Sequence, residues 1–276
     1  MKKRILAITL VLALTLSLSL LAGCNNSKSN GDGPVTITVG ATPVPHTEIL
    51  EFIKDKLAAE GFDLQIRTFT DYVQPNLATE SGDLDANFFQ HVPYMTNFNE
   101  EHGTHMVSVF PVHFEPLGLY KARTSSLADL PEGAIIAIPN DATNGARALR
   151  LLESAGLITL RQGATLMATK LDVADNPLNI DIRELEAAQL PHILPDVDMA
   201  VINGNFALQA GLQIDVDAVA VEDKDSLSAT TYANPIVVKA GNENNPGIVA
   251  LINALNSSDV RDFINNKYEG CVVPVF

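Results

Sequence analysis

The sequence has no tryptophan, and only two of its 276 residues, Cys24 and Cys271, are cysteines. So few thiols exclude a disulfide-rich scaffold. Basic residues are also scarce, because 18 Lys and Arg stand against 33 Asp and Glu and give a formal net charge of −15. Nucleic-acid binding needs clustered basic side chains, so we expect no nucleic-acid partner, and charge alone would not hold the chain on an anionic membrane. Hydrophobic residues at 46% predict a folded globular protein.

Catalytic signatures are missing as well. The sequence contains no Gly-x-Ser-x-Gly elbow, no His-Glu-x-x-His and no phosphate-binding Gly-x-x-x-x-Gly-Lys. Four histidines lie within 23 positions, but no cysteine is near them, and His46 and His192 are far away in the sequence. We therefore expect neither a metal site nor a cofactor, and we expect His102 and His105 to lie in a solvated loop near the surface turn over residues 100–104. The four are His91, His102, His105 and His113.

The N-terminus has the pattern of an export signal. Residues 2–4 are Lys-Lys-Arg, and residues 5–22 are uncharged and rich in Leu, Ala, Ile and Val. An uncleaved membrane anchor is the alternative, because the apolar run is slightly long. Leu21-Ala22-Gly23-Cys24 resembles the lipobox of bacterial lipoproteins, in which the cysteine accepts a diacylglyceryl group and becomes the first residue of the mature chain. A cysteine placed there by chance is the competing interpretation. The sequence thus predicts a signal peptide over 1–23 and an exported chain acylated at Cys24.

The residues after the lipobox are polar and then apolar in short runs. Residues 24–34 combine Cys24 with a Gly-, Ser- and Asn-rich tether. Cys271 lies in an apolar C-terminal stretch, so we expect it to be packed and unreactive. Without residues 1–23 the formal charge becomes −18, because three basic residues and no acidic ones are removed.

Strand-like and helix-like patterns alternate along the body. The pattern predicts an α/β fold with largely parallel sheets. Strands are expected at residues 35–39, 62–69, 107–110, 134–138, 199–202, 216–221 and 236–238. Helices are expected at residues 48–60, 146–155, 247–255 and 258–267.

One strand ends in a segment suited to an anion. Ile138 is followed by Pro-Asn-Asp-Ala-Thr-Asn-Gly and then by a helix, whose first turn is expected to contain Arg147. A cation there is opposed by the helix dipole, so an anion held by Arg147 and the helix amides would offset that cost. The alternative is an Arg147 that faces solvent and pairs with Asp141.

Further segments place polar and aromatic residues at strand ends, where α/β proteins bind ligands. Each has a simpler interpretation as core or turn. The segments are Asp85–Tyr94, His113–Tyr120, Val201–Asn205 and Tyr232–Ile236.

Together these segments resemble the NlpA-type substrate-binding lipoproteins of methionine ABC importers, from Val35 to Phe276. Several long motifs occur in the same order behind a lipobox, which makes the resemblance specific. The motifs are Ala86–Tyr94, Ile138–Leu149, Leu185–Pro191, Ala200–Asn203, Val221–Lys224 and Asn234–Val238.

The resemblance implies a two-lobed, periplasmic-binding-protein clamshell in which the chain crosses between the lobes. Residues 35–117 plus 233–276 would form lobe 1, and residues 118–232 would form lobe 2. The ligand would lie in the cleft, and the lobes would close over it by hinge motion.

The resemblance also implies how an amino acid is held. Arg147 would bind the carboxylate, helped by amides near Asn144 and Gly145. Asn203 and Asn234 would hold the ammonium or the carboxylate, and Glu115 is a counter-charge for the ammonium. An apolar slot would take a thioether tail. Its candidate residues are Phe88, His91, Tyr94, His113 and Phe114. Fine specificity is open, because Phe88 and the run Asn203–Phe206 depart from the residues expected for the family.

The function implied is capture of methionine, with the D-enantiomer as a second candidate, and its delivery to an ABC importer permease. The protein would be a monomer, anchored in the cell membrane through palmitate-type lipid on its extracytoplasmic face. Another amino acid, a methionine derivative or a small dipeptide is the first alternative ligand. An exported two-lobed enzyme that uses His91 and Glu115 is a remote alternative, and an adhesin or structural lipoprotein is another.

Overall fold

The computed structural model describes residues 33–224 and 227–276. Six strands form the first sheet in the order β13-β4-β12-β3-β1-β2. Strand β1 runs parallel to β2 and β3, whereas β12 is antiparallel to β3 and β4, and β13 is antiparallel to β4. The strands are β1 (Val35–Ala41), β2 (Phe62–Thr68), β3 (Ala86–Phe88), β4 (Met106–Phe114), β12 (Asn234–Lys239) and β13 (Val273–Pro274).

Five strands form the second sheet in the order β11-β5-β10-β6-β9. Strands β10, β6 and β9 are parallel, and β5 is antiparallel to both β10 and β11. The strands are β5 (Gly118–Lys121), β6 (Ile135–Pro139), β9 (Asp181–Leu185), β10 (Met199–Ile202) and β11 (Ala218–Val221). A small antiparallel pair, β7 (Thr159–Leu160) and β8 (Val173–Asp175), forms a separate two-stranded sheet that packs against the core of the second sheet through Leu160 and Val173.

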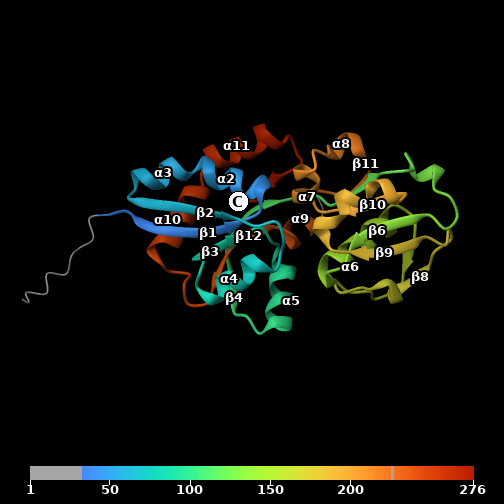
Figure 1. Ribbon diagram of the computed structural model, residues 1–276, viewed down its shortest axis with the longest axis horizontal. Helices are drawn as coiled ribbons and strands as arrows, with labels where there is room; N and C mark the ends of the chain where they lie inside the picture. The colour runs from blue at the N-terminus through green and yellow to red at the C-terminus, as the bar shows by residue number, and fades with distance from the viewer. Residues whose placement is uncertain (1–32, 225–226) are drawn as a thin grey trace, which may run out of the picture. The chain divides into compact units, whose positions relative to one another are not determined.

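Helices surround each sheet (Figure 1). Those that accompany the first sheet are α2 (Glu48–Phe52), α3 (Lys54–Ala59), α4 (Gln74–Ser81), α5 (Val92–His102), α10 (Pro246–Leu255) and α11 (Ser258–Tyr268). The remaining α-helices are α6 (Ala142–Ser154), α7 (Gly204–Gln209), α8 (Ile214–Asp217) and α9 (Leu227–Thr231). A π-helical turn η1 (Pro43–Thr47) and three 3₁₀ segments, η2 (Leu127–Asp129), η3 (Lys170–Asp172) and η4 (Ala187–Asp196), complete the described elements.

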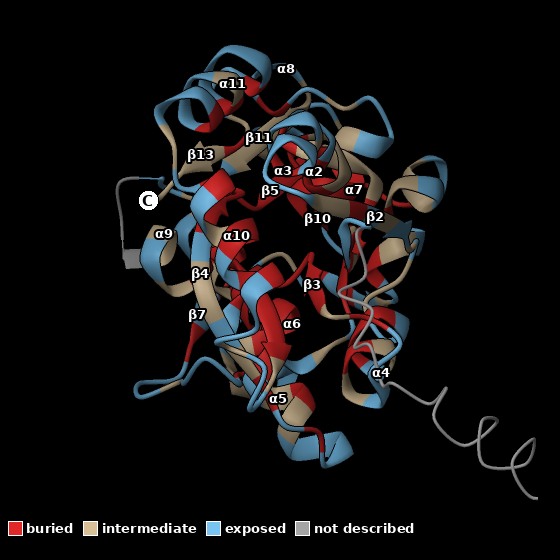
Figure 2. Cartoon of the chain, turned by 90° about the vertical axis from the view of Figure 1, so that its left-hand side faces the viewer, coloured by how far each residue is buried: buried red, intermediate tan, exposed pale blue. Residues whose placement is uncertain are grey.

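Each sheet has its own hydrophobic core. Strands β1, β4 and β12 bury Val39, Val112 and Ile236 in a cluster covered by α2, α3, α10 and α11. The second sheet buries Ile136 against α6 on one face and Ala137 against η4 on the other. Buried residues gather on the strands and on the inner faces of the helices, while the outer faces of α3, α4 and α11 are exposed (Figure 2). The alternation of apolar residues in the strands therefore fixes which face meets the helices.

The chain passes between the two sheets twice. It leaves β4 at Phe114 and enters β5 at Gly118, and it leaves β11 at Val221 and re-enters the first sheet at Asn234. Because Val237 of β12 is antiparallel to β3, the returning strand makes the first sheet mixed. The prediction of largely parallel sheets is therefore wrong, since apolar periodicity carries no information on strand direction.

The predicted α/β fold class is confirmed, and several element boundaries differ from those expected. The helix expected over 48–60 is divided at Ile53 into α2 and α3. Residues 214–217 form α8, so the strand expected from 216 begins at Ala218. Helix α6 begins at Ala142, four residues earlier than expected, because Asp141 caps it by accepting a hydrogen bond from the Asn144 amide.

The predicted signal peptide, Cys24 and the tether up to residue 32 lie outside the described residues. Within the part of the chain that the structure describes, no helix has both the length and the apolar character needed to cross a membrane. Cys271 packs against hydrophobic clusters of both sheets, as predicted, and burial raises the pKa of its thiol.

Candidate functional site

A small pocket lies where the ends of strands from both sheets meet the crossing segments. Asn203 directly follows β10, and Glu115 and Asn234 flank the two crossings between the sheets. This placement agrees with the general position of ligand sites at the carboxyl ends of strands. The lining residues are Tyr72, Phe89, Gln90, His91, Tyr94, Glu115, Asn144, Arg147, Asn203, Gly204, Asn205 and Asn234.

A chain of hydrogen bonds fixes the amides on one wall of the pocket. The Asn144 amide nitrogen Nδ2 donates to both carboxylate oxygens of Asp141 at 3.1 Å, so its Oδ1 must be the acceptor on the other side. That oxygen lies 3.0 Å from Nε2 of His91 and accepts from Nδ2 of Asn203 at 2.8 Å. His91 Nδ1 accepts from the Tyr94 backbone amide at 3.1 Å, so the His91 proton belongs on Nε2. Burial and, to a lesser extent, the charge of Arg147 together lower the pKa of His91 to about 3, so the ring is neutral.

Two buried amide atoms at the pocket have no partner among the described residues. Because Asn203 donates its nitrogen to Asn144, its Oδ1 remains an unused acceptor. Asn205 accepts at Oδ1 from the Tyr72 hydroxyl at 2.5 Å, so its Nδ2 remains an unused donor. Buried polar atoms are nearly always hydrogen-bonded, and leaving one unpaired costs about 1–3 kcal/mol. The pocket therefore presents one acceptor and one donor that a polar ligand can satisfy.

Arg147 supplies a buried positive charge at the pocket. Its Nε lies 3.1 and 3.0 Å from the two carboxylate oxygens of Glu222, and its Nη2 donates to Glu222 and, at 2.8 Å, to the backbone oxygen of Glu115. The Tyr232 ring lies 4.3 Å from the guanidinium carbon. Among the described residues Nη1 has no hydrogen-bond partner, so one edge of the fork is available to a ligand carboxylate.

These contacts correct the predicted setting of Arg147 in two ways. Since α6 begins at Ala142, Arg147 lies in the second turn and not in the first. The helix amides expected to bind an anion are already used, because those of Asn144 and Gly145 donate to the side chain and backbone of Asp141. The pairing of a solvent-facing Arg147 with Asp141 is also wrong, since Arg147 is buried and its carboxylate partner is Glu222, 75 positions away in the sequence.

Aromatic rings form the apolar part of the pocket. The Tyr72 ring centroid lies 5.6 Å from that of Phe89, 5.7 Å from that of Tyr94 and 5.0 Å from that of Phe206. Phe89 and Tyr94 are buried, and the Tyr94 hydroxyl donates to the Tyr72 backbone oxygen at 3.3 Å. An uncharged side chain with a polarisable atom fits such a wall of rings.

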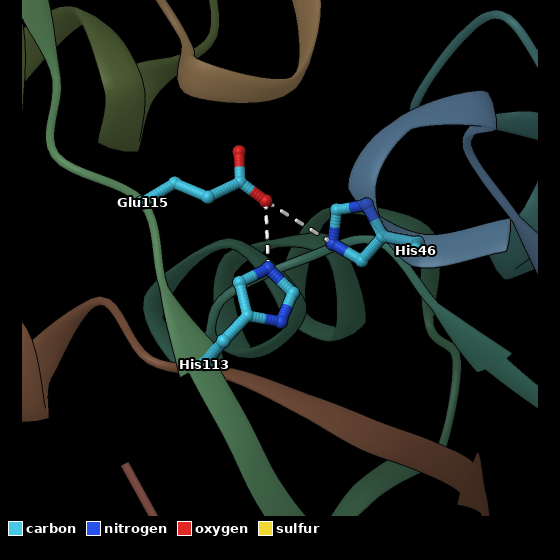
Figure 3. A group of neighbouring side chains, drawn as sticks. All are labelled: His46, His113 and Glu115. Carbon is cyan, nitrogen blue, oxygen red and sulfur yellow. Dashed lines mark hydrogen bonds and ion pairs between the residues drawn. The ribbon is translucent and has the colours of Figure 1, made fainter. Parts of the chain in front are cut away.

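Glu115 supplies a buried carboxyl group on the same pocket (Figure 3). Its Oε1 lies 2.8 Å from Nε2 of His113 and 3.4 Å from Nε2 of His46. Burial raises the pKa of Glu115, while the opposing contributions of His46, the Asn205 backbone amide and Arg147 lower it. Burial lowers the pKa of His46 and of His113 to about 3, so both rings are neutral at physiological pH.

His46, His113 and Glu115 also have the composition of a metal site, and they are the one such group within the described part of the chain. Metal-binding histidines nearly always donate their second ring nitrogen to a partner. His113 Nδ1 is buried without any hydrogen bond to the described residues, which argues against a metal there. His102 and His105, expected in a solvated loop, are exposed, although His102 belongs to α5.

Seven of the nine predicted site residues line the pocket. They are His91, Tyr94, Glu115, Asn144, Arg147, Asn203 and Asn234. Phe88 and His113 do not, because both are fully buried behind it, with ring centroids 5.3 Å apart. Phe114, the further candidate for the slot, is also fully buried and lies under Arg147, whose guanidinium carbon is 5.6 Å from its ring. No hydrogen bond among the described residues joins His91 to Glu115, the pair that the enzyme alternative would use.

Comparison with known proteins decides the family. The family model described as NlpA lipoprotein matches residues 37–276. The chain belongs to the NlpA lipoprotein family. The match begins inside β1 and runs to the last residue, so it includes both sheets and the pocket.

This NlpA-family chain is similar to proteins from several bacteria over nearly its whole length. It is 44% identical to the membrane lipoprotein TpN32 of Treponema pallidum over 270 residues, which is 98% of this chain and 97% of that one. It superposes with a TM-score of 0.82 on a nutrient-binding protein from Burkholderia cenocepacia bound to methionine, at 43% identity, covering 87% of this chain and 100% of that one. A periplasmic substrate-binding protein of an ABC transporter from Coxiella burnetii gives a TM-score of 0.81 at 39% identity, with coverage of 87% and 100%.

The sequence interpretation of this NlpA-family chain missed five pocket residues and one neighbour. Tyr72, Phe89, Gln90, Gly204 and Asn205 line the pocket. Four of these adjoin predicted site residues, so proximity to Asn203 or His91 was a usable signal, whereas Tyr72 lies in a loop with no motif. His46, judged remote from the histidine cluster, lies in contact with Glu115, because η1 brings it across the sheet to the end of β4.

Proposed function

We propose that this protein captures free methionine outside the cytoplasm and delivers it to an ABC importer. One observation carries the proposal: the unpaired Asn203 Oδ1 and Asn205 Nδ2 lie in a pocket that also contains Arg147 and Glu115. The Asn203 oxygen and the Glu115 carboxylate can accept hydrogen bonds from an ammonium group. The Asn205 amide nitrogen and the Arg147 guanidinium can donate to a carboxylate. The ligand is therefore a zwitterion, which is what a free amino acid is at neutral pH.

Each group of the amino acid has assigned partners. The carboxylate binds the free edge of Arg147 and Nδ2 of Asn205. The ammonium donates to Oδ1 of Asn203 and to the carboxylate of Glu115. Asn234 and Asn144 orient these partners, since Asn234 Oδ1 lies 3.3 Å from His46 Nε2 and Asn144 holds Asn203.

The aromatic wall selects the side chain. Tyr72, Phe89 and Tyr94 offer ring contacts that favour a thioether by about 0.3–1.5 kcal/mol each. The Burkholderia cenocepacia protein, 43% identical to this chain, is bound to methionine. Phe88 and His113 lie behind the pocket, where their rings pack against each other, and they do not contact the ligand.

The pocket works as the cleft of a clamshell. Residues 35–117 with 233–276 form lobe 1 around the first sheet, and residues 118–232 form lobe 2 around the second. In support, all strands of each sheet fall within one of these two sets. The lobes open about the two crossings and close over methionine, which brings Arg147 and Asn203 of lobe 2 against His91 and Tyr94 of lobe 1.

Anchoring follows from the N-terminus. Residues 1–23 are removed as a signal peptide, Cys24 carries the lipid, and residues 25–34 tether the body to the extracytoplasmic face of the cell membrane. The protein is a monomer that presents methionine to the permease. The relatives support this location, since they include a membrane lipoprotein and a periplasmic protein of an ABC transporter.

A thermal-shift panel on residues 25–276 tests the ligand. The protein is unfolded and refolded to remove carried-over ligand, then mixed with the common amino acids, D-methionine, methionine derivatives and methionine-containing dipeptides. Ligand at 1,000 times its dissociation constant adds about 4 kcal/mol, which corresponds to roughly 8–16 °C for a chain of this size. A large shift with methionine alone is expected, and a larger shift with another compound would replace the ligand.

Arg147→Ala tests the carboxylate assignment. We expect it to abolish most methionine binding in isothermal titration, whereas Arg150→Ala, on the same helix but outside the pocket, should keep it. Binding by the Arg147 variant within about twofold of the wild type would contradict the assignment. Asn234→Ala tests whether the Asn234 amide is needed to orient the binding groups, and it too should abolish most methionine binding.

A further inference from the structure

Two buried imidazoles meet on a single carboxylate oxygen. His46 comes from η1 and His113 from β4, and the Nε2 atoms of both point toward Oε1 of Glu115 (Figure 3). All three side chains are almost fully buried. No sequence motif joins them, since His46 and Glu115 are 69 positions apart.

The neighbours of His46 determine where its proton is. Asn234 directs its amide nitrogen to the Tyr232 backbone oxygen at 3.4 Å, so Asn234 Oδ1 is the atom that faces His46 Nε2 at 3.3 Å. An acceptor at that position requires a proton on Nε2. His46 Nδ1 then accepts from the Thr42 hydroxyl at 2.7 Å. The Nε2–H group therefore donates to Asn234 Oδ1, and Nε2 also lies 3.4 Å from Glu115 Oε1.

His113 has a proton on the same nitrogen. Its Nε2 is 2.8 Å from Glu115 Oε1, and its Nδ1 is buried with no partner among the described residues. A proton on Nδ1 would be a buried donor without an acceptor, and it would leave the Nε2 lone pair facing the carboxylate. A proton on Nε2 avoids both costs and gives a hydrogen bond to an anion, which is about twice as strong as a neutral one.

With Oε1 occupied in this way, the other oxygen of Glu115 is free for the pocket. Oε2 points away from both rings in Figure 3 and lies beside Gly204, which lines the pocket.

We propose that His46 and His113 are positioning residues that keep Glu115 ionised with Oε2 toward the pocket, and so make the site selective for a ligand with a free ammonium group. The inference rests on the proposed function and deepens it, because it names the groups that impose the requirement for an unblocked amine. Neither imidazole touches the ligand. His113 donates to Oε1, and the polar Nε2–H group of His46 lies beside the same oxygen, so both rings favour the charged form of the buried carboxylate.

Charged and titratable groups face Glu115 from every packed element. They are His46 on η1, His113 on β4, Arg147 on α6, Tyr72 in the loop before α4, Tyr120 on β5 and Tyr268 on α11. Burial raises the pKa of Glu115 and the donors oppose it, so acidification protonates Glu115 and weakens ammonium binding. Removing a donor raises this pKa further, so the loss of affinity begins at a higher pH.

The test compares two replacements of His113 by isothermal titration. His113→Met removes the donor at similar volume, whereas His113→Gln keeps an N–H close to the position of Nε2. The probes are methionine and 4-(methylthio)butanoate, which lacks the amine. We expect His113→Met to weaken methionine binding at pH 7 about tenfold or more and to leave 4-(methylthio)butanoate binding within twofold. His113→Gln should restore most of the methionine affinity, and His192→Met, at an exposed site, should match the wild type.

The pH profile separates positioning from simple structural damage. Between pH 5 and 8 the methionine affinity of His113→Met should fall at a higher pH than that of the wild type, and Glu115→Gln should remove the dependence. An unchanged midpoint in His113→Met, or equal loss of both probes, would overturn the proposal.

If a variant does not fold, the proposal can still be tested by measuring proton release when the wild type binds methionine. If Glu115 is already ionised, methionine binding at pH 7 releases no proton, and the calorimetric enthalpy is the same in phosphate and Tris buffers. Release of about one proton per methionine would show a protonated Glu115 and overturn the proposal. A wild type that binds no amino acid at all would instead refute the proposed function.

Discussion

At the scale of single residues, the pocket depends on side chains that have two tasks. Arg147 holds Glu222 with one edge of its guanidinium and the backbone of Glu115 with Nη2, which leaves Nη1 for a ligand. An ammonium group in its place could not satisfy both partners, because Lys lacks the planar fork.

Arg147→Lys is therefore expected to weaken methionine binding although it keeps the positive charge. We expect methionine affinity to fall about tenfold or more, measured by isothermal titration, because the shorter reach and single nitrogen cannot hold Glu222 and the carboxylate together. Arg150→Lys is the matched control, since Arg150 on the same helix bonds to the backbone oxygens of Ala164 and Thr165. Equal affinity of Arg147→Lys and the wild type would mean that a point charge is sufficient.

Gly204 is a second residue with a positional requirement. A Cβ atom there would lie 2.8 Å from both Cβ and Oε2 of Glu115, closer than such contacts allow. Gly204→Ala should therefore displace Glu115 and reduce methionine affinity about tenfold, beyond a stability loss of about 1–3 kcal/mol.

Gly247→Ala separates the loss of stability from the loss of methionine affinity expected for Gly204→Ala. Its Cβ would meet Ile37 Cγ1 at 2.8 Å in the core of the first sheet, away from the pocket. We expect a similar loss of stability in urea unfolding with unchanged methionine affinity. If both variants lose affinity alike, the effect of Gly204→Ala is general destabilisation.

At the scale of elements, the start of α6 organises one wall of the pocket. Asp141 caps the helix through the Asn144 backbone amide and at the same time holds the Asn144 side chain, which orients Asn203. The same carboxylate therefore stabilises the helix and sets the direction of the pocket amides.

Asp141→Ala should reveal both roles. Loss of the cap costs about 0.5–2 kcal/mol, and the freed Asn144 amide should reduce methionine affinity by more than this stability loss alone explains. Asn245→Ala is the matched control, because Asn245 caps α10 through Gly247 and lies outside the pocket. Urea unfolding and titration of both variants should show similar destabilisation and a binding defect in Asp141→Ala only.

At the scale of the whole molecule, three buried histidines make the free energy of unfolding decrease as the pH falls. His46, His91 and His113 have pKa values lowered to about 3, first of all by burial, against about 6.5 in an unfolded chain. Between pH 6.5 and 3 the unfolded state binds more protons than the folded state, so stability falls as the pH falls. Glu115 and Asp141, whose pKa values burial raises, act in the opposite direction above pH 4.5.

We expect the free energy of unfolding to fall by a few kcal/mol between pH 7 and pH 5, with about 2 kcal/mol from each histidine before the opposing carboxyl contributions. Urea unfolding at pH 7, 6 and 5 measures the slope. His91→Gln should have a shallower slope, because one group that takes up a proton on unfolding is gone. An identical slope in the wild type and the variant would show that His91 does not contribute.

Much of the fold follows from local pattern. Apolar alternation predicted β1, β2, β10 and β12 to within a few residues, and the apolar face of α10 and α11 was evident. The local pattern did not predict the division of the 48–60 helix at Ile53 or the short α8. Each depends on packing between elements rather than on local propensity.

The resemblance to the family, the class of fold and seven pocket residues could be predicted from local motifs, since Ala86–Tyr94 and Asn203 include or directly follow strand ends. The partners of these residues depend on the tertiary structure. Arg147 meets Glu222 instead of Asp141, and His46 meets Glu115 across 69 positions, because sheet order and not sequence distance sets which side chains are neighbours. Burial then sets the charge of each group, and burial is a property of the folded chain.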